Sequence, residues 1–266
     1  MRYGPHPDQV ADVRLPEAVD PTRPLVVVVH GGFWRAKYDR HHTGPLAADL
    51  AERGWPVAQL EYRRTGQDGG GWPGTFADVA AGLTVLPALV ADLLTADLLT
   101  ADPLTADPLA GPPLLLGHSA GGHLALWWAG LTGPAAVRGV VALAPVTNLA
   151  AAHRLDLDGG AVAALLGGGP QQVPRRYAYA EPRRPHVPTV VIHGGQDRQV
   201  PVTLSRDWTA CGDAELIELP DVEHFAVIDP HSAAWPAVVR TLERLASLPT
   251  SDAGLRQAAN NATTRD

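Results

Sequence analysis

The sequence predicts an α/β fold in which a mostly parallel sheet is covered by helices on both faces. Apolar runs of strand length recur along the chain, and those at residues 25–29 and 114–116 are uninterrupted, as is typical of strands buried on both faces. Helix-compatible segments separate these runs, so right-handed crossovers must connect successive strands. With 266 residues and 45% hydrophobic content, the chain can supply the core of one substantial domain.

Taken in order, the expected elements alternate between strand and helix. Strands are expected near residues 12–15, 25–29, 57–62, 114–116, 137–145, 188–193 and 214–219. Helices are expected near residues 46–53, 76–90, 120–128, 161–166, 202–211 and 232–245. Residues 148–187 interrupt this alternation with one short helix, three glycines and a Pro/Arg-rich stretch. We therefore expect a single domain over residues 1–248 with a small inserted cap, and a disordered tail over residues 249–266.

Residues 89–111 contain an internal repeat of the type Leu-Thr-Ala-Asp. Its five-residue period advances by about 140° per step on a helix, so its leucines spiral around the axis instead of forming one face. Pro103 and Pro108 also stop a helix in its second half. We interpret the repeat as a low-complexity extension of a surface helix and loop. The alternative, an acidic cation site, lacks the glycines and convergent oxygens of calcium loops.

Composition excludes several classes of function. The formal net charge is −7 and no basic stripe is present, which argues against a nucleic-acid partner. The only cysteine, Cys211, excludes an intrachain disulfide and a thiolate zinc cluster. Residues 1–10 lack the pattern of a secretory signal, and the apolar runs are far shorter than a membrane span. We expect a cytoplasmic protein without a membrane partner, metal or cofactor, and leave its oligomeric state open.

One motif stands between a predicted strand and a predicted helix. The apolar run at residues 114–116 leads directly into Gly117-His118-Ser119-Ala120-Gly121. This order is typical of a nucleophile elbow, in which a strand ends, the chain turns sharply, and a helix starts with its amides beside the serine oxygen. Gly117 and Gly121 are expected because a side chain there would collide with a neighbouring strand or helix. The alternative is an ordinary turn with a serine N-cap.

A serine hydroxyl becomes a useful nucleophile when an imidazole takes its proton and a carboxylate orients that imidazole. The chain offers Ser119, Asp197 and His224 in this order, each just after a predicted strand, where catalytic groups of parallel sheets gather. The other serines lie in predicted helices or the tail: Ser205, Ser232, Ser247 and Ser251. His193 is expected to brace a loop, and Asp221 is too close in sequence to orient His224. We therefore predict a catalytic triad.

Acyl transfer also needs donors for the developing oxyanion. The backbone amides of Gly32, Phe33 and Ala120 are our candidates, because a Gly-Gly turn after a buried strand can turn its N–H groups inward. The alternative is a tight turn with the following aromatic residues as packing. The residues expected to line the substrate pocket are Trp34, His118 and Tyr177.

Two segments, His30-Gly31-Gly32-Phe33-Trp34 and the motif around Ser119, resemble the α/β-hydrolase superfamily. Within it they are most similar to the kynurenine formamidase (arylformamidase) and small carboxylesterase group, where His-Gly-Gly-x-Trp marks the oxyanion loop. Further similarities lie at residues 61–63, 72–73, 78, 165–168 and 193–197. The resemblance spans residues 24–246. The chain departs from the group's pattern at residues 180–182, on the cap side of the pocket, where such proteins often carry Ser-Pro.

This resemblance implies the α/β-hydrolase fold and a cofactor-independent serine hydrolase that works through an acyl-enzyme. The implied substrate is a small ester or aryl-formamide, with N-formylkynurenine as one candidate. Two alternatives remain: a general short-chain carboxylesterase, and a non-catalytic binding protein with the same fold.

Overall fold

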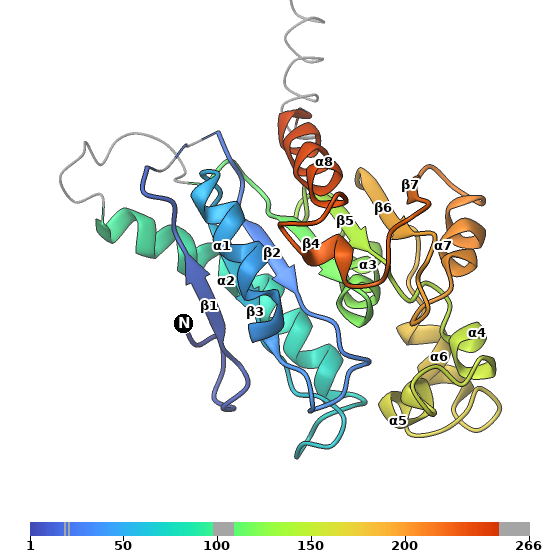
Figure 1. Ribbon diagram of the computed structural model, residues 1–266. Coiled ribbons are helices and arrows are strands. Elements are labelled where there is room, and N and C mark those ends of the chain that lie inside the picture. The colour runs from blue at the N-terminus through green and yellow to red at the C-terminus, as the bar shows by residue number, and fades with distance from the viewer. Residues whose placement is uncertain (19, 21, 98–108, 250–266) are drawn as a thin grey trace, which may run out of the picture.

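The computed structural model describes residues 1–18, 20, 22–97 and 109–249 (Figure 1). Its centre is a seven-stranded sheet with the order β1-β3-β2-β4-β5-β6-β7. β1 pairs antiparallel with β3, and the other neighbouring strands run parallel. The strands are β1 (Ala11–Arg14), β2 (Val26–Val29), β3 (Val57–Leu60), β4 (Leu114–His118), β5 (Gly139–Leu143), β6 (Thr189–Gly194) and β7 (Glu215–Leu219). The predicted fold class, a mostly parallel sheet with helices on both faces, is confirmed.

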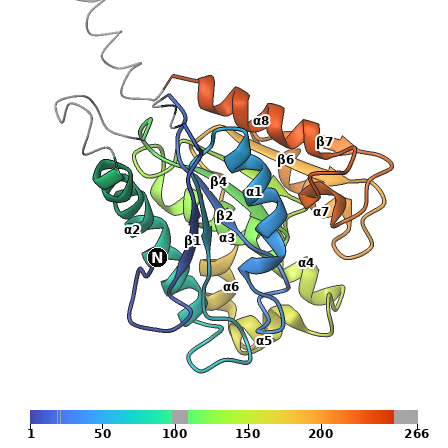
Figure 2. The ribbon, with the colours of Figure 1, turned by 60° about the vertical axis from the view of Figure 1, so that its left-hand side comes forward.

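Helices pack on each side of this sheet (Figure 2). One face carries α1 (Gly44–Glu52) and α8 (Trp235–Ser247), and the other carries α2 (Gly74–Asp97) and α3 (Ala120–Thr132). α7 (Val202–Thr209) follows β6. Two short 3-10 helices, η1 (Arg40–Thr43) and η2 (Ala226–Ile228), lie in the loops that follow β2 and β7.

The core is divided by the sheet because side chains of a strand alternate between its faces. In β2, Val26 and Val28 belong to the cluster that includes Trp235 of α8. Val27 and Val29 belong to the opposite cluster, which includes residues of α2 and α3. All four valines are buried, so the continuous apolar run of β2 reflects burial on both faces.

Three short helices occupy the predicted cap region at residues 148–187: α4 (Leu149–Arg154), α5 (Ala161–Leu166) and α6 (Pro174–Ala180). The sequence predicted only the second of them. In Figure 1 these helices lie together beyond one end of the sheet strands.

Helix α2 is longer than predicted. It continues through Pro87 to Asp97, and its buried side chains include Leu83, Leu86 and Leu94. Its length and composition would allow a membrane span, but core helices share these properties, and one face of α2 packs on the sheet. Residues 98–108 of the repeat, and the tail from residue 250, lie outside the described residues.

Candidate active site

Ser119 occupies the sharp turn between β4 and α3. Its backbone angles are φ 55° and ψ −116°, a conformation that costs a non-glycine residue about 1–3 kcal/mol. Its N–H donates to the carbonyl of Leu143 on β5 at 2.8 Å, which ties the turn to the neighbouring strand. The Ser119 side chain makes no capping hydrogen bond to α3. Ser119 thus stands at the N-cap position of α3 without capping it through its side chain, and the hydroxyl is available for other chemistry.

The two flanking glycines are required by close backbone packing. A Cβ atom at Gly121 would stand 2.5 Å from the carbonyl oxygen of His30 and still closer to that of Val29. A Cβ at Gly117 would stand 2.7 Å from Cα of Gly122. These distances are below any ordinary carbon contact. The expectation that side chains cannot be accommodated here is confirmed.

Gly121→Ala is expected to lower the free energy of unfolding by about 3 kcal/mol or more, because the methyl group must push α3 away from the end of β2. Urea unfolding measures this loss. Gly44→Ala is the matched control: Gly44 begins α1 with φ −54°, and its Cβ would meet only the Arg14 guanidinium, at 4.0 Å. The control should leave stability unchanged or raise it by about 0.5 kcal/mol. Equal stabilities of the two variants would contradict this account.

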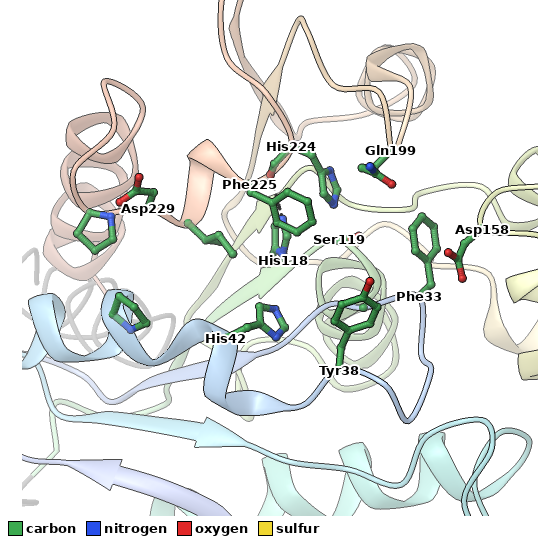
Figure 3. Close-up of a pocket in the computed structure, with 14 residues that line it drawn as sticks. Phe33, Tyr38, His42, His118, Ser119, Asp158, Gln199, His224, Phe225 and Asp229 are labelled. Atoms are coloured by element: carbon green, nitrogen blue, oxygen red, sulfur yellow. Dashed lines mark hydrogen bonds between the residues drawn. The ribbon is translucent and has the colours of Figure 1, made fainter.

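Asp197 and His224 come together at the carboxyl end of the sheet. The Nδ1–H of His224 donates to Oδ2 of Asp197 at 2.6 Å, and the other carboxylate oxygen accepts the backbone N–H groups of Gln199 and Val200, both at 2.8 Å. His224 lies in the loop between β7 and η2 and is only 4% exposed. Because Nδ1 carries the proton, Nε2 of His224 remains as a base. Ser119 and His224 line the same pocket (Figure 3).

His193 is a second partner of the same carboxylate. Its Nε2 lies 3.1 Å from Oδ2 of Asp197 and 3.0 Å from the carbonyl of Val200, and its Nδ1 lies 2.7 Å from the hydroxyl of Ser205. Both partners of Nε2 are acceptors, so this nitrogen carries a proton. The expectation that His193 braces a loop is confirmed.

The pKa of Asp197 follows from these contacts. Burial raises the pKa of its carboxyl, but the hydrogen bonds from His193 and His224 outweigh burial and hold the pKa well below its usual range. Asp197 is therefore a permanent anion at neutral pH, able to stabilise a protonated His224.

The predicted oxyanion loop has an unusual backbone. Gly32, Phe33 and Trp34 have φ angles of 103°, 50° and 56°, so three successive residues are left-handed. A Cβ at Gly31 would stand 2.9 Å from the His118 carbonyl oxygen and 3.0 Å from Cβ of Ser119, which shows how closely the loop approaches the nucleophile turn. Among the described residues, no group accepts a hydrogen bond from the amides of Gly32, Phe33 or Ala120. These donors are free for a ligand oxygen.

A buried hydrogen bond supports this loop, and the sequence did not predict it. Nε2 of His30 lies 2.9 Å from Oε1 of Glu61, and the imidazole stacks on Tyr62, with ring centroids 4.3 Å apart. The Tyr62 hydroxyl donates to the His30 carbonyl at 2.7 Å. Burial raises the pKa of Glu61, but the hydrogen bond from His30 and the nearby Arg64 charge bring it below its usual value. The family resemblance at Glu61-Tyr62-Arg63 was the available signal in the sequence, but nothing in it indicated that Glu61 pairs with a residue 31 positions away.

The pocket at Ser119 has a volume of about 440 Å³. Figure 3 shows His224, Phe225 and His118 grouped on one side, Phe33 and Tyr38 on another, and the carboxylates of Asp158 and Asp229 at opposite ends. The remaining lining residues are Gly32, His42, Pro45, Ser119, Gln199, Ile228 and Pro230. The walls are thus mainly aromatic and aliphatic. Within the described ranges, no cluster of three His, Cys, Asp or Glu side chains could hold a metal ion.

Two of the three predicted pocket residues are elsewhere. Trp34 is fully buried and packs edge-to-face on His123. Tyr177 lies on α6, where its hydroxyl donates to the Gly168 carbonyl at 3.3 Å. Only His118 lines the pocket as predicted. The sequence missed Tyr38 and Phe225, although Phe225 directly follows the predicted base.

Comparison with known proteins agrees with this geometry. The family model described as serine aminopeptidase, S33, matches residues 20–167, and the model described as serine hydrolase matches residues 104–244. A search of curated proteins gave no match.

Solved structures share the fold. A truncated carbohydrate esterase from gut microbiota has a TM-score of 0.73 at 17% identity, covering 93% of this chain and 95% of its own. Esterase B from Lactobacillus rhamnosis has a TM-score of 0.72 at 21% identity, covering 98% and 87%. Esterase 2 from Thermogutta terrifontis has a TM-score of 0.63 at 21% identity, covering 91% and 90%. Because each family model matches more than half of the 266-residue chain, the protein belongs to the serine hydrolases of the α/β-hydrolase superfamily.

Proposed function

We propose that this serine hydrolase cleaves small esters or aryl-formamides through an acyl-enzyme formed on Ser119. The observation that carries the proposal is the Asp197–His224 pair, whose free imidazole nitrogen lies in the same pocket as a serine held in a strained, uncapped turn. Unengaged backbone amides adjoin that serine on two sides. The mechanism needs no cofactor.

The proposed reaction begins when Nε2 of His224 takes the proton of the Ser119 hydroxyl while Oγ bonds to the substrate carbonyl carbon. The carbonyl electron pair becomes an oxyanion, which accepts hydrogen bonds from the loop and helix amides described above. The bond to the leaving alcohol or amine then breaks as His224 returns the proton to it. A water molecule repeats these steps with Ser119 as the leaving group and releases the acid.

The pocket favours small, uncharged or cationic substrates over anionic ones. About 440 Å³ holds a short acyl group and an aromatic leaving group, and Phe33, Tyr38 and Phe225 offer apolar contacts to a ring. No Lys or Arg lines the pocket in the described part of the chain, and Asp229 stands at one end of it without an ion-pair partner among the described residues, whereas Asp158 at the other end is paired with Arg35. The sequence resemblance supports an aryl-formamide such as N-formylkynurenine. The esterase neighbours and the apolar walls support a general short-chain carboxylesterase equally well.

The test compares hydrolysis of N-formyl-L-kynurenine with that of p-nitrophenyl acetate. We expect turnover of the ester, and a kcat/KM for the formamide at least tenfold higher would support the arylformamidase function. Turnover of the ester alone would retain the mechanism and make the protein a carboxylesterase. Labelling by a fluorophosphonate probe tests the mechanism itself. Failure to hydrolyse either substrate, combined with failure to label, would favour a non-catalytic binding protein.

A further inference from the structure

His118 is a buried histidine for which the proposed reaction has no use so far. It ends β4, immediately before Ser119, and is only 2% exposed. Its Nε2 lies 3.1 Å from the carbonyl oxygen of His224. A carbonyl can only accept, so Nε2 carries the proton and donates it, and Nδ1 is left with a lone pair. Among the described residues, Nδ1 is buried without a hydrogen-bond partner.

This hydrogen bond gives His224 a second fixed point. Asp197 holds the imidazole at Nδ1, and His118 holds the main chain of the same residue. The two imidazoles also pack together, with centroids 4.7 Å apart. Because His118 and Ser119 are consecutive at the end of β4, the bond links the loop that carries the base directly to the strand that carries the nucleophile.

The remaining contacts hold this loop less directly. The Gln196 N–H donates to the Val222 carbonyl at 3.0 Å, two residues before His224, and thus ties the loop to the exit of β6. After His224, the loop continues into Phe225, whose side chain is 57% exposed. Of the hydrogen bonds among described residues, that of His118 is the one that joins the loop to β4.

We infer that His118 is a positioning residue that sets the main chain of His224 so that Nε2 can serve both Ser119 and the leaving group. The inference rests on the proposed function. His118 takes no part in the proton transfers from Ser119 to His224 and from His224 to the leaving group, because its N–H donates to the His224 carbonyl. Burial is consistent with this role, because it lowers the pKa of the His118 imidazole well below its usual value and so keeps the ring neutral.

The role predicts a dependence on the leaving group. p-Nitrophenolate departs without a proton, whereas the alkoxide of ethyl acetate must receive the proton from Nε2 of His224 as it leaves. A misplaced base therefore slows acylation of Ser119 by ethyl acetate more than acylation by p-nitrophenyl acetate. A general loss of folded protein would slow both substrates by the same factor.

The matched variants are His118→Met and His118→Gln, whose side chains have the same length. Gln keeps an N–H donor near the position of Nε2, and Met does not. For His118→Met we expect kcat/KM on ethyl acetate, which reports acylation, to fall by about 30- to 100-fold, with a loss in kcat/KM at least fivefold smaller on p-nitrophenyl acetate. His118→Gln should recover most of the lost rate. Fluorophosphonate titration sets the concentration of active sites in each preparation.

Two results would overturn the inference: wild-type rates in His118→Met, or equal losses on both substrates that His118→Gln does not rescue. If His118→Met does not fold, His118→Asn replaces it, because its amide is one methylene too short to reach the His224 carbonyl. Failure of the proposed function is distinguishable, since the wild-type protein would then neither label nor hydrolyse either ester.

Discussion

Ser119→Ala is expected to lower kcat on p-nitrophenyl acetate by about 10⁴- to 10⁶-fold, the range found when the nucleophile of a catalytic triad is removed. Without Oγ, no acyl-enzyme forms, and only the polarising effect of the free amides on a bound ester remains. The fold should persist, because alanine at φ 55° carries the same backbone strain as serine and the side chain makes no capping bond that could be lost. Initial rates and urea unfolding of the same preparations measure both quantities.

The control for this prediction is Ser247→Ala. Ser247 is the exposed last residue of α8, and its hydroxyl bonds only to the Arg244 carbonyl, at 2.8 Å. Its replacement should leave both rate and fluorophosphonate labelling unchanged. Hydrolysis or labelling that survives in Ser119→Ala would show that another group is the nucleophile.

The architecture and the elbow could be predicted because each depends on short-range pattern. The valines of β2 are consecutive and apolar, and this pattern arises when both faces of a strand are covered. Gly117 and Gly121 have fixed spacing from Ser119, and the structure explains each by a backbone collision. The order Ser119, Asp197, His224 placed the three residues at strand ends, and the parallel sheet brings the last two into contact.

The pocket walls could not be predicted in the same way, because they depend on where loops travel. Trp34 directly follows Phe33 and has a similar φ, 56° against 50°, yet the Trp34 ring is buried in the core while Phe33 lines the pocket. Tyr38 lies four residues later and faces the pocket instead. Asp158 reaches the pocket from the cap and forms an ion pair with Arg35, 123 residues away. No local pattern encodes such contacts.

Asp197→Asn is expected to lower kcat by about 10⁴-fold, and the surrounding hydrogen bonds explain why. Oδ1 accepts two backbone N–H groups, so the asparagine amide oxygen must occupy that position. Its NH₂ group then replaces Oδ2 and faces Nδ1 of His224 and Nε2 of His193. As a donor, it forces His224 to accept at Nδ1 and to carry its proton on Nε2, where it cannot take the proton of Ser119.

Asp221→Asn is the matched control, since Asp221 is exposed, close to His224 in sequence, and the alternative acid. Its replacement should change kcat by less than twofold.

A second readout is the pH dependence of stability. The pKa of Asp197 is depressed in the folded protein, so its carboxylate stabilises the fold above the ordinary value of 3.8, and this contribution is lost as the pH falls below it. Asp197→Asn should therefore flatten the acid limb of the stability curve, whereas Asp221→Asn should not. A larger loss of activity in Asp221→Asn than in Asp197→Asn would show that Asp221, and not Asp197, is the acid of the triad.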